Sequence, residues 1–369
     1  MENGHVRLEA TPRVSGFALN NGKEGEKVDV LFRAFITSDK KEFYGYIDQI
    51  SNLYLNKHFL MHHVSNFLIV VHKDDSTDVY IEPPVRLIAL SKSKIVLGEL
   101  VKLSDIADIS QLSFDEEVKL DEEDCIIFCF KVGWKFGLFF DFSAKHSTPL
   151  NLEKIPFELA DFYKTLQFEK TYAILENTPL FETLKKDGWF PFIELLPNDY
   201  TNLATLYEED REQSDFLSQF DEARVNRISS KWFQAPIFKE KEKILGEGIS
   251  AYVNGSYISC IKTLYSEIEG IIRLQYFKEK GKKPTTNDLM EYVKEKATNR
   301  FVSKNSLSFP PHFYSYLQDQ IFAGFDLSVN DVPTSRHSVN HGVLEEKGYT
   351  PERALQAILT LDQIYYFIS

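Results

Sequence analysis

Ser-Arg-His-Ser-Val-Asn-His-Gly, residues 335–342, is the stretch of this chain that bears most directly on its fold and chemistry. It places Arg336 five positions before His341, with a second imidazole, His337, between them. A fixed cation beside a titratable imidazole can hold a phosphodiester and move its protons. The stretch also comes just ahead of the clearest helix signal near the end of the chain, so it joins a chemical motif to a helical region.

The chain from residue 236 onward has the spacing of a helical bundle. Thr350 and Pro351 are an N-cap and a first helical residue. The residues that then form one predicted apolar face are Ala354, Leu355, Ile358, Leu361, Tyr365 and Ile368. Upstream, segments 236–252 and 257–277 predict paired helices joined at Asn254-Gly255, and Glu267 and Glu269 interrupt the apolar pattern of the second. Further helices are predicted for 286–296 and 310–322.

The first 150 residues have a different pattern, that of β-strands. The β-branched and aromatic runs lie at 28–37, 67–72, 79–81, 85–90, 125–132 and 134–142. They predict an antiparallel sheet or a sandwich, with a tight connection at 131–135. Segments 156–166 and 178–186 then have helical spacing. We therefore predict an α+β multidomain chain with a β-rich sensor or regulatory domain (1–150), a helical connecting region (151–235) and a helical domain (236–369).

Composition and charge limit the classes of protein. The 369 residues carry a formal charge of −13, which argues against broad, non-specific binding of nucleic acid. The acidic excess lies before residue 236, because residues 236–369 hold 16 basic and 16 acidic side chains. Three cysteines and the absence of a basic-then-apolar start predict a reducing, cytoplasmic setting. The apolar runs are too short to cross a bilayer, so we predict no membrane partner.

Positive charge gathers between residues 273 and 304, where nine basic side chains face four acidic ones. The lysines at its centre are Lys278, Lys280, Lys282 and Lys283. Two interpretations stay open for this segment. It is either a solvated loop between helices or a rim that attracts phosphates near Arg336.

The last third of the chain resembles a HEPN domain, an all-helical module common in prokaryotic defence and toxin systems. The resemblance rests on the helical pair around residues 251–270, on the Arg336-to-His341 spacing with a polar residue directly after the arginine, and on the terminal helix. It implies a metal-independent endoribonuclease without cofactors, acting in antiviral defence or as a toxin. It also implies RNA as substrate, a homodimer, and an antitoxin or a phage-derived trigger as a further partner. Residues 1–235 resemble no family that we identify.

The resemblance also implies a role for each motif residue. Arg336 grips the scissile phosphate, His341 is the general base or acid, and His337 positions or polarises. On a straight helix Arg336 and His341 lie about 140° apart, whereas His337 and His341 lie within about 40°. A bend, or the motif of a second copy, would be needed to bring all three together.

Three other interpretations remain for the same residues. Arg336 and His341 could cap helices and contact the Glu267/Glu269 region. His337, His341 and Glu345 could hold a metal ion along one helical face. The helical domain could also be a non-catalytic dimerisation or binding module, with a ligand- or protein-binding β-region.

Overall fold

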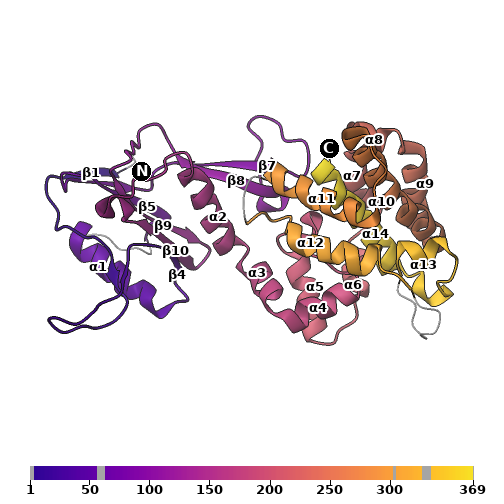
Figure 1. Cartoon of the computed structure of the whole chain (residues 1–369), viewed down its shortest axis with the longest axis horizontal. Helices are drawn as coiled ribbons and strands as arrows, with labels where there is room; N and C mark the ends of the chain where they lie inside the picture. The colour runs from indigo at the N-terminus through magenta and orange to yellow at the C-terminus, as the bar shows by residue number, and fades with distance from the viewer. Residues whose placement is uncertain (1–3, 56–62, 302–304, 326–333, 369) are drawn as a thin grey trace. The chain divides into compact units, whose positions relative to one another are not determined.

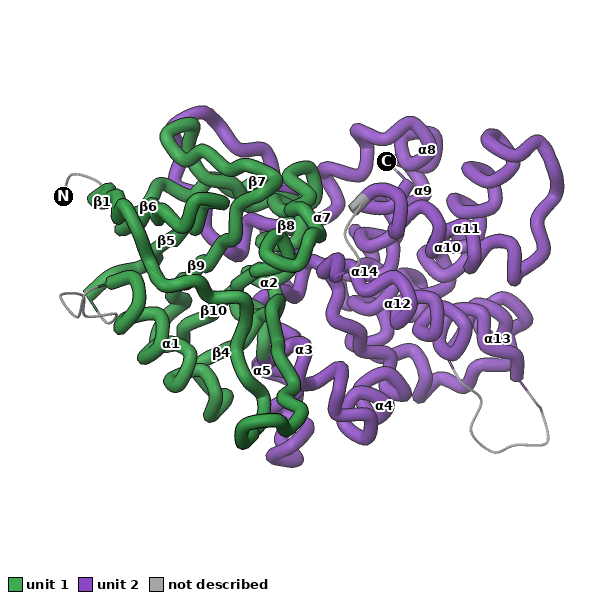
Figure 2. Tube along the Cα trace, turned by 60° about the vertical axis from the view of Figure 1, so that its left-hand side comes forward, with its two compact units in different colours: residues 1–88, 109–169 green, residues 89–108, 170–369 purple. Residues whose placement is uncertain are grey.

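The computed structural model describes residues 4–55, 63–301, 305–325 and 334–368. The chain divides into two compact units, unit 1 with Met1–Ile88 and Ile109–Glu169, and unit 2 with Ala89–Asp108 and Lys170–Ser369 (Figure 2). Unit 1 is built on an antiparallel sheet and unit 2 is mainly helical, which confirms the predicted α+β class. The three-part division at residues 150 and 235 stays a prediction.

The described part of unit 1 contains a six-stranded antiparallel sheet with the strand order β1-β6-β5-β9-β10-β4 (Figure 1). Its strands are β1 (Gly4–Leu8), β4 (Arg33–Thr37), β5 (Asn66–Val71), β6 (Thr77–Ile81), β9 (Cys125–Val132) and β10 (Lys135–Asp141). Val132 pairs with Lys135, so the predicted tight connection between the last two strands is present. Two short ladders pair β2 (Phe17–Ala18) with β3 (Val30–Leu31), and β7 (Val85–Ser91) with β8 (Ile106–Phe114).

A helix covers each face of this sheet. Phe140 of β10 packs in one apolar cluster with Phe43 of α1 (Lys41–Tyr54). Its neighbour Phe139 points the other way, with its ring centroid 4.9 Å from that of Phe162 in α2 (Ile155–Gln167). Adjacent residues of a strand face opposite sides of a sheet, so this pair shows that both faces are buried. Helices α1 and α2 therefore cover the two faces of the sheet, and Phe17 of the short β2–β3 ladder joins the cluster on the α1 side.

Unit 2 is a bundle of helices, most of them near the predicted positions. Its α-helices are α3 (Glu169–Glu176), α4 (Thr178–Lys186), α5 (Asp199–Glu208), α6 (Ser214–Ser218), α7 (Glu222–Ser230), α8 (Pro236–Lys239), α9 (Glu242–Val253), α10 (Tyr257–Lys280), α11 (Thr286–Phe301), α12 (Pro310–Tyr316), α13 (Arg336–Asn340) and α14 (Pro351–Ile368). A π-turn at Leu317–Ile321 and single 3-10 turns at Leu103–Asp105, Ser143–His146, Ile193–Leu195, Trp232–Gln234 and Glu346–Gly348 complete the described elements. No helix among the described residues is long and apolar enough to cross a membrane.

Helix α14 differs from its prediction in one respect. It begins at Pro351 as expected, but it is buried on all sides rather than along one apolar face. Its polar side chains are buried with partners, because Gln363 accepts a hydrogen bond from the Ile193 amide and Asp362 pairs with Lys231. Buried polar groups are tolerated when they are bonded in this way. Helix α14 is thus a central helix, and it packs against α10 and α11.

Candidate functional site

The motif Arg336–His341 forms a single helical turn on unit 2. Ser335 is the N-cap of α13, since its hydroxyl accepts a hydrogen bond from the Ser338 amide while the Ser338 hydroxyl accepts one from the Ser335 amide. Gly342 follows with φ of +71°, a conformation that glycine adopts without strain and that ends the helix. The turn is therefore fixed locally at both ends. Val339 is buried beneath it, and α13 packs against α10.

Arg336 is held by an acidic residue of α10. Its guanidinium forms an ion pair with Glu269, and the two side chains are 18% and 9% exposed. The same carboxylate also accepts a hydrogen bond from Nε of Arg273, at 3.2 Å. Glu269 thus bridges two guanidinium groups, and the three side chains together keep one positive charge.

The two histidines of the motif stack on each other. The rings of His337 and His341 are nearly parallel, at 3°, with centroids 6.3 Å apart. Helical spacing predicted this shared face. His341 caps the C-terminus of α13 and is exposed, and its ring lies 5.9 Å from that of Phe325.

His337 also contacts Arg336 directly. Nη1 of the guanidinium lies 3.2 Å from Nδ1 of the imidazole. Because a guanidinium only donates, Nδ1 must accept, which places the proton of the neutral ring on Nε2. Burial lowers the pKa of His337, and the charge of Arg336 lowers it further. His337 is therefore a neutral imidazole near pH 7, with its Nε2–H turned away from the arginine.

The structure thus brings the motif residues together within one chain, without a bend in a long helix. Arg336 touches His337, and His337 stacks on His341. The capping interpretation also contains a correct contact, because Arg336 does reach Glu269 and His341 does cap α13. The metal interpretation gains no support, since no three His, Cys, Asp or Glu residues in the described ranges could hold a metal ion together.

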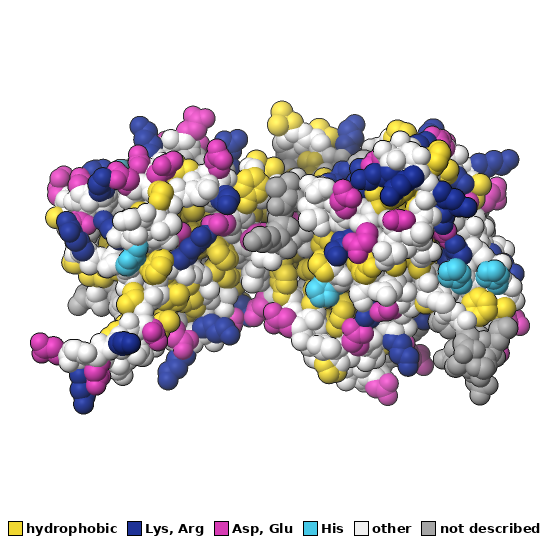
Figure 3. Space-filling model, viewed as in Figure 1, with side chains coloured by type: hydrophobic (Ala, Val, Ile, Leu, Met, Phe, Trp, Pro, Cys, Tyr) yellow, Lys and Arg dark blue, Asp and Glu magenta, His cyan; other side chains and the backbone are white. Residues whose placement is uncertain are grey.

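The basic segment joins the C-terminal end of α10 to α11. Lys278 pairs with Glu240, and Lys280 lies 3.6 Å from Glu295. Lys282 places its ammonium 6.0 Å from the ring of Tyr276, and Lys283 is exposed. Figure 3 shows many dark blue side chains on this part of unit 2, with acidic groups among them. Two of the four lysines predicted to attract the phosphates of RNA, Lys278 and Lys280, are thus paired with carboxylates.

The basic segment is tied to the motif by a chain of side chains. Arg273, which shares Glu269 with Arg336, also donates from Nη1 to the Pro284 carbonyl at 3.0 Å. Pro284 ends the lysine loop just before α11. One carboxylate therefore connects the motif turn to the loop. The sequence marked Glu269 as a break in an apolar face and as part of a region that Arg336 could contact, but nothing in the spacing indicated that Arg273 shares its carboxylate.

Compared with protein-family models, with curated proteins and with solved structures, the chain gives no match.

Proposed function

We propose that this chain is a metal-independent endoribonuclease of the HEPN type. The observation that supports it most is the cluster on α13, where an anchored guanidinium, a neutral imidazole and an exposed imidazole touch in sequence. The substrate is RNA, because the proposed reaction uses the ribose 2′-hydroxyl. No metal takes part in the proposed step.

The reaction moves two protons, one from the attacking 2′-hydroxyl and one to the leaving 5′-oxygen. His341 takes the proton of the 2′-hydroxyl as general base, and the 2′-oxygen attacks the neighbouring phosphorus. The bond from phosphorus to the 5′-oxygen breaks, and a protonated imidazole from the motif of a second copy gives that oxygen its proton. The products are a 2′,3′-cyclic phosphate and a 5′-hydroxyl. Arg336 stabilises the negative charge that develops on the phosphoryl oxygens, and His337 orients the other two groups.

A homodimer suits this assignment, since each motif has one exposed histidine, which supplies either the base or the acid. Antiviral defence or a toxin role, with an antitoxin or a phage-derived trigger as partner, rests on the family resemblance alone. Growth arrest on expression of the wild-type chain, relieved by His341→Ala, would support that role. Normal growth at matched protein levels would argue against it.

The direct test is cleavage of a fluorescent RNA by the full-length protein in EDTA. We expect cleavage by the wild type, and none of a matched RNA with a single 2′-deoxy residue at the cut position. His146→Ala, in unit 1, is a histidine control that keeps wild-type activity. Cleavage of the deoxy substrate, or activity that only a metal restores, would refute the mechanism.

One specific observation favours a second function, a non-catalytic binding or dimerisation module. Glu269 already neutralises Arg336, which leaves the guanidinium less free to hold a phosphate. Under this alternative the wild type binds RNA or itself but leaves RNA intact. The cleavage assay separates the two functions.

A further inference from the structure

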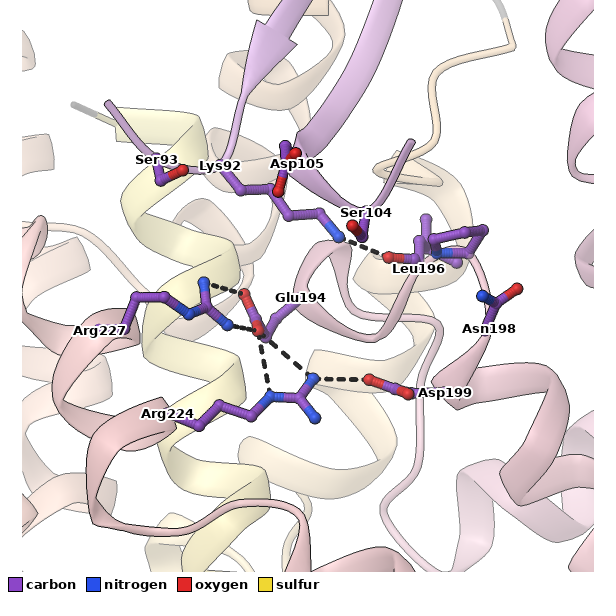
Figure 4. A pocket seen from close by; sticks show the side chains of 11 residues that line it. Lys92, Ser93, Ser104, Asp105, Glu194, Leu196, Asn198, Asp199, Arg224 and Arg227 are labelled. Atoms are coloured by element: carbon purple, nitrogen blue, oxygen red, sulfur yellow. Dashed lines mark hydrogen bonds and ion pairs between the residues drawn. The ribbon is translucent and has the colours of Figure 1, made fainter. Parts of the chain in front are cut away.

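A second site lies within unit 2, formed by residues outside α13. A cavity of about 330 Å³ is lined by the 89–108 segment, by the stretch from Glu194 to Asp199, and by α7 (Figure 4). Its lining residues include Lys92, Ser93, Ser104, Asn198, Arg224 and Arg227. A volume of this size is at the lower end of small-molecule sites.

The two arginines of the cavity are already engaged. Arg224 and Arg227 both contact the buried carboxylate of Glu194, as Figure 4 shows, and Arg224 also pairs with Asp199 at 2.6 Å. Asp105, the remaining carboxylate of the lining, accepts a hydrogen bond from the Lys102 amide at 2.8 Å. Two guanidiniums thus stand against three carboxylates, so these residues leave one negative charge, and the ammonium of Lys92 offsets it.

Lys92 is the cation of the lining that touches no carboxylate of a described residue. It is 5% exposed, and its ammonium donates one hydrogen bond, to the Leu196 carbonyl at 2.5 Å. Among the described residues, none of the ion pairs includes Lys92. Burial lowers the pKa of Lys92 to about 8, so the group is mostly protonated at pH 7. Glu194 and Asp199 attract this charge from a longer distance. An ammonium has three donors, so with one hydrogen bond to a carbonyl it keeps donors for a bound anion.

The start of α5 adds a second attraction for an anion. Asn198 is the N-cap of this ten-residue helix, and its side chain accepts no capping hydrogen bond. The first amides of a helix are open donors at the positive end of the helix dipole, and they favour negative charge. Both Asn198 and Asp199 line the cavity.

The free donors also indicate which anion fits. Arginine forks suit planar carboxylates, and both forks of this cavity are taken. The donors that remain free are one ammonium, the helix amides, two serine hydroxyls and the Asn198 amide. Each of these groups points a donor at a single acceptor atom, and together they line the cavity. Such donors suit the tetrahedral oxygens of a phosphate.

We infer that the cavity around Lys92 binds a small molecule that carries a phosphate group. The phosphate pairs with the ammonium of Lys92 and accepts from the N-terminus of α5 and from Ser104. Because Lys92 and Ser104 belong to the 89–108 segment and Asn198 to the chain before α5, the ligand links these two parts of unit 2. The site does not depend on the proposed ribonuclease activity.

The test is calorimetric titration of the full-length protein with inorganic phosphate and with adenosine monophosphate, with thermal midpoints measured in parallel. We expect binding by the wild type and about tenfold weaker binding by Lys92→Met, since one charged hydrogen bond is lost. Lys94→Met removes the same charge from an exposed position two residues away and is the matched control. Binding should also weaken as the pH rises through about 8, where Lys92 loses its proton.

Ser104→Ala provides an independent variant, because Ser104 is exposed and its loss does not disturb packing. It should weaken phosphate binding several-fold even if Lys92→Met fails to fold. Equal affinities for the wild type, Lys92→Met and Ser104→Ala would overturn the assignment. The assignment would also be overturned if neither inorganic phosphate nor adenosine monophosphate bound to the wild type. Tighter binding of acetate than of phosphate would overturn it as well.

Discussion

Glu269 of α10 and Arg336 of α13 form an ion pair that joins residues 67 positions apart in the chain. The pair lies beside the stacked histidines, because Arg336 also contacts His337. The contact therefore holds the motif turn against the longest helix of the bundle. It makes Glu269 a positioning residue for the proposed chemistry.

Replacing Glu269 tests this relationship. Glu269→Gln removes a mostly buried carboxylate from two guanidiniums and should cost on the order of 2 kcal/mol of unfolding free energy. RNA cleavage should fall by more than the loss of folded protein explains, because Arg336 loses its anchor. Chemical denaturation and single-turnover cleavage measure the two effects. Glu279→Gln, also on α10, loses a partly exposed pair with Lys296 of α11; it is the control and should leave cleavage unchanged.

Substitutions in the motif should lower RNA cleavage much more than they lower the stability of the fold. His341→Ala should lower cleavage about 10²-fold or more while moving the thermal midpoint by at most about 2 °C, since the side chain is exposed. Arg336→Lys keeps a positive charge beside Glu269 but loses the planar guanidinium that can donate to two phosphoryl oxygens. It should therefore lower cleavage with little loss of stability. Parallel melting and cleavage curves check both. Unchanged cleavage in His341→Ala would exclude its catalytic role.

His72 gives unit 1 a pH-dependent stability. Burial opposes its protonation, but hydrogen bonds to Asp78 and Asp124 outweigh burial and raise the pKa of His72. A raised folded-state pKa means that the stabilisation is complete below the unfolded value of about 6.5 and is lost as the pH rises through the folded value.

We therefore expect unit 1 to lose stability between pH 6.5 and pH 8.5, and His72→Gln to remove that dependence. Hydrogen exchange of the β5 and β9 amides at the two pH values measures it within the full chain. An increase in protection with pH would contradict the assignment.

The four lysines of the basic segment should not contribute equally. The double variant Lys282→Gln/Lys283→Gln should weaken RNA binding and reduce the slope of log affinity against log salt by about 0.7 per lost contact. The matched double variant Lys278→Gln/Lys280→Gln should have a smaller effect, because those lysines are paired with Glu240 and Glu295. Fluorescence anisotropy at several salt concentrations compares the pairs. Equal affinity of both variants and the wild type would leave the segment as a solvated loop.

A shared active site predicts that one inactive chain silences its partner, because each copy supplies one histidine. A mixed dimer of wild-type and His341→Ala chains, purified through two different tags, should cleave no better than the His341→Ala homodimer, since it holds either the base or the acid but not both. Sedimentation of the wild type should give twice the monomer mass of 42.7 kDa. A fully active monomer would rule out a shared site, and so would a mixed dimer with about half of the wild-type activity.

Much of the local structure followed from the order of residues. The start of α14 at Thr350-Pro351, the break at Asn254-Gly255 and the turn between β9 and β10 all lie where the sequence predicts them. The helix α1 was not predicted, because the region around it is rich in strand signals and its N-cap, Lys40, makes no capping hydrogen bond. Strand β8 was also missed, since Asp108, Ser110 and Gln111 interrupt its apolar residues.

The sequence by itself determined the ends of the helices, the strand-rich first part and the composition of the motif. Caps, glycine conformations and apolar periodicity act within a few residues, so they are visible in the chain order. Tertiary structure alone decided which charges meet, including Glu269 with two arginines and Lys92 with none of the carboxylates described. It also decided that α14 is buried on every side. Such pairings depend on distances between segments far apart in the chain, and those distances are set only when the helices pack.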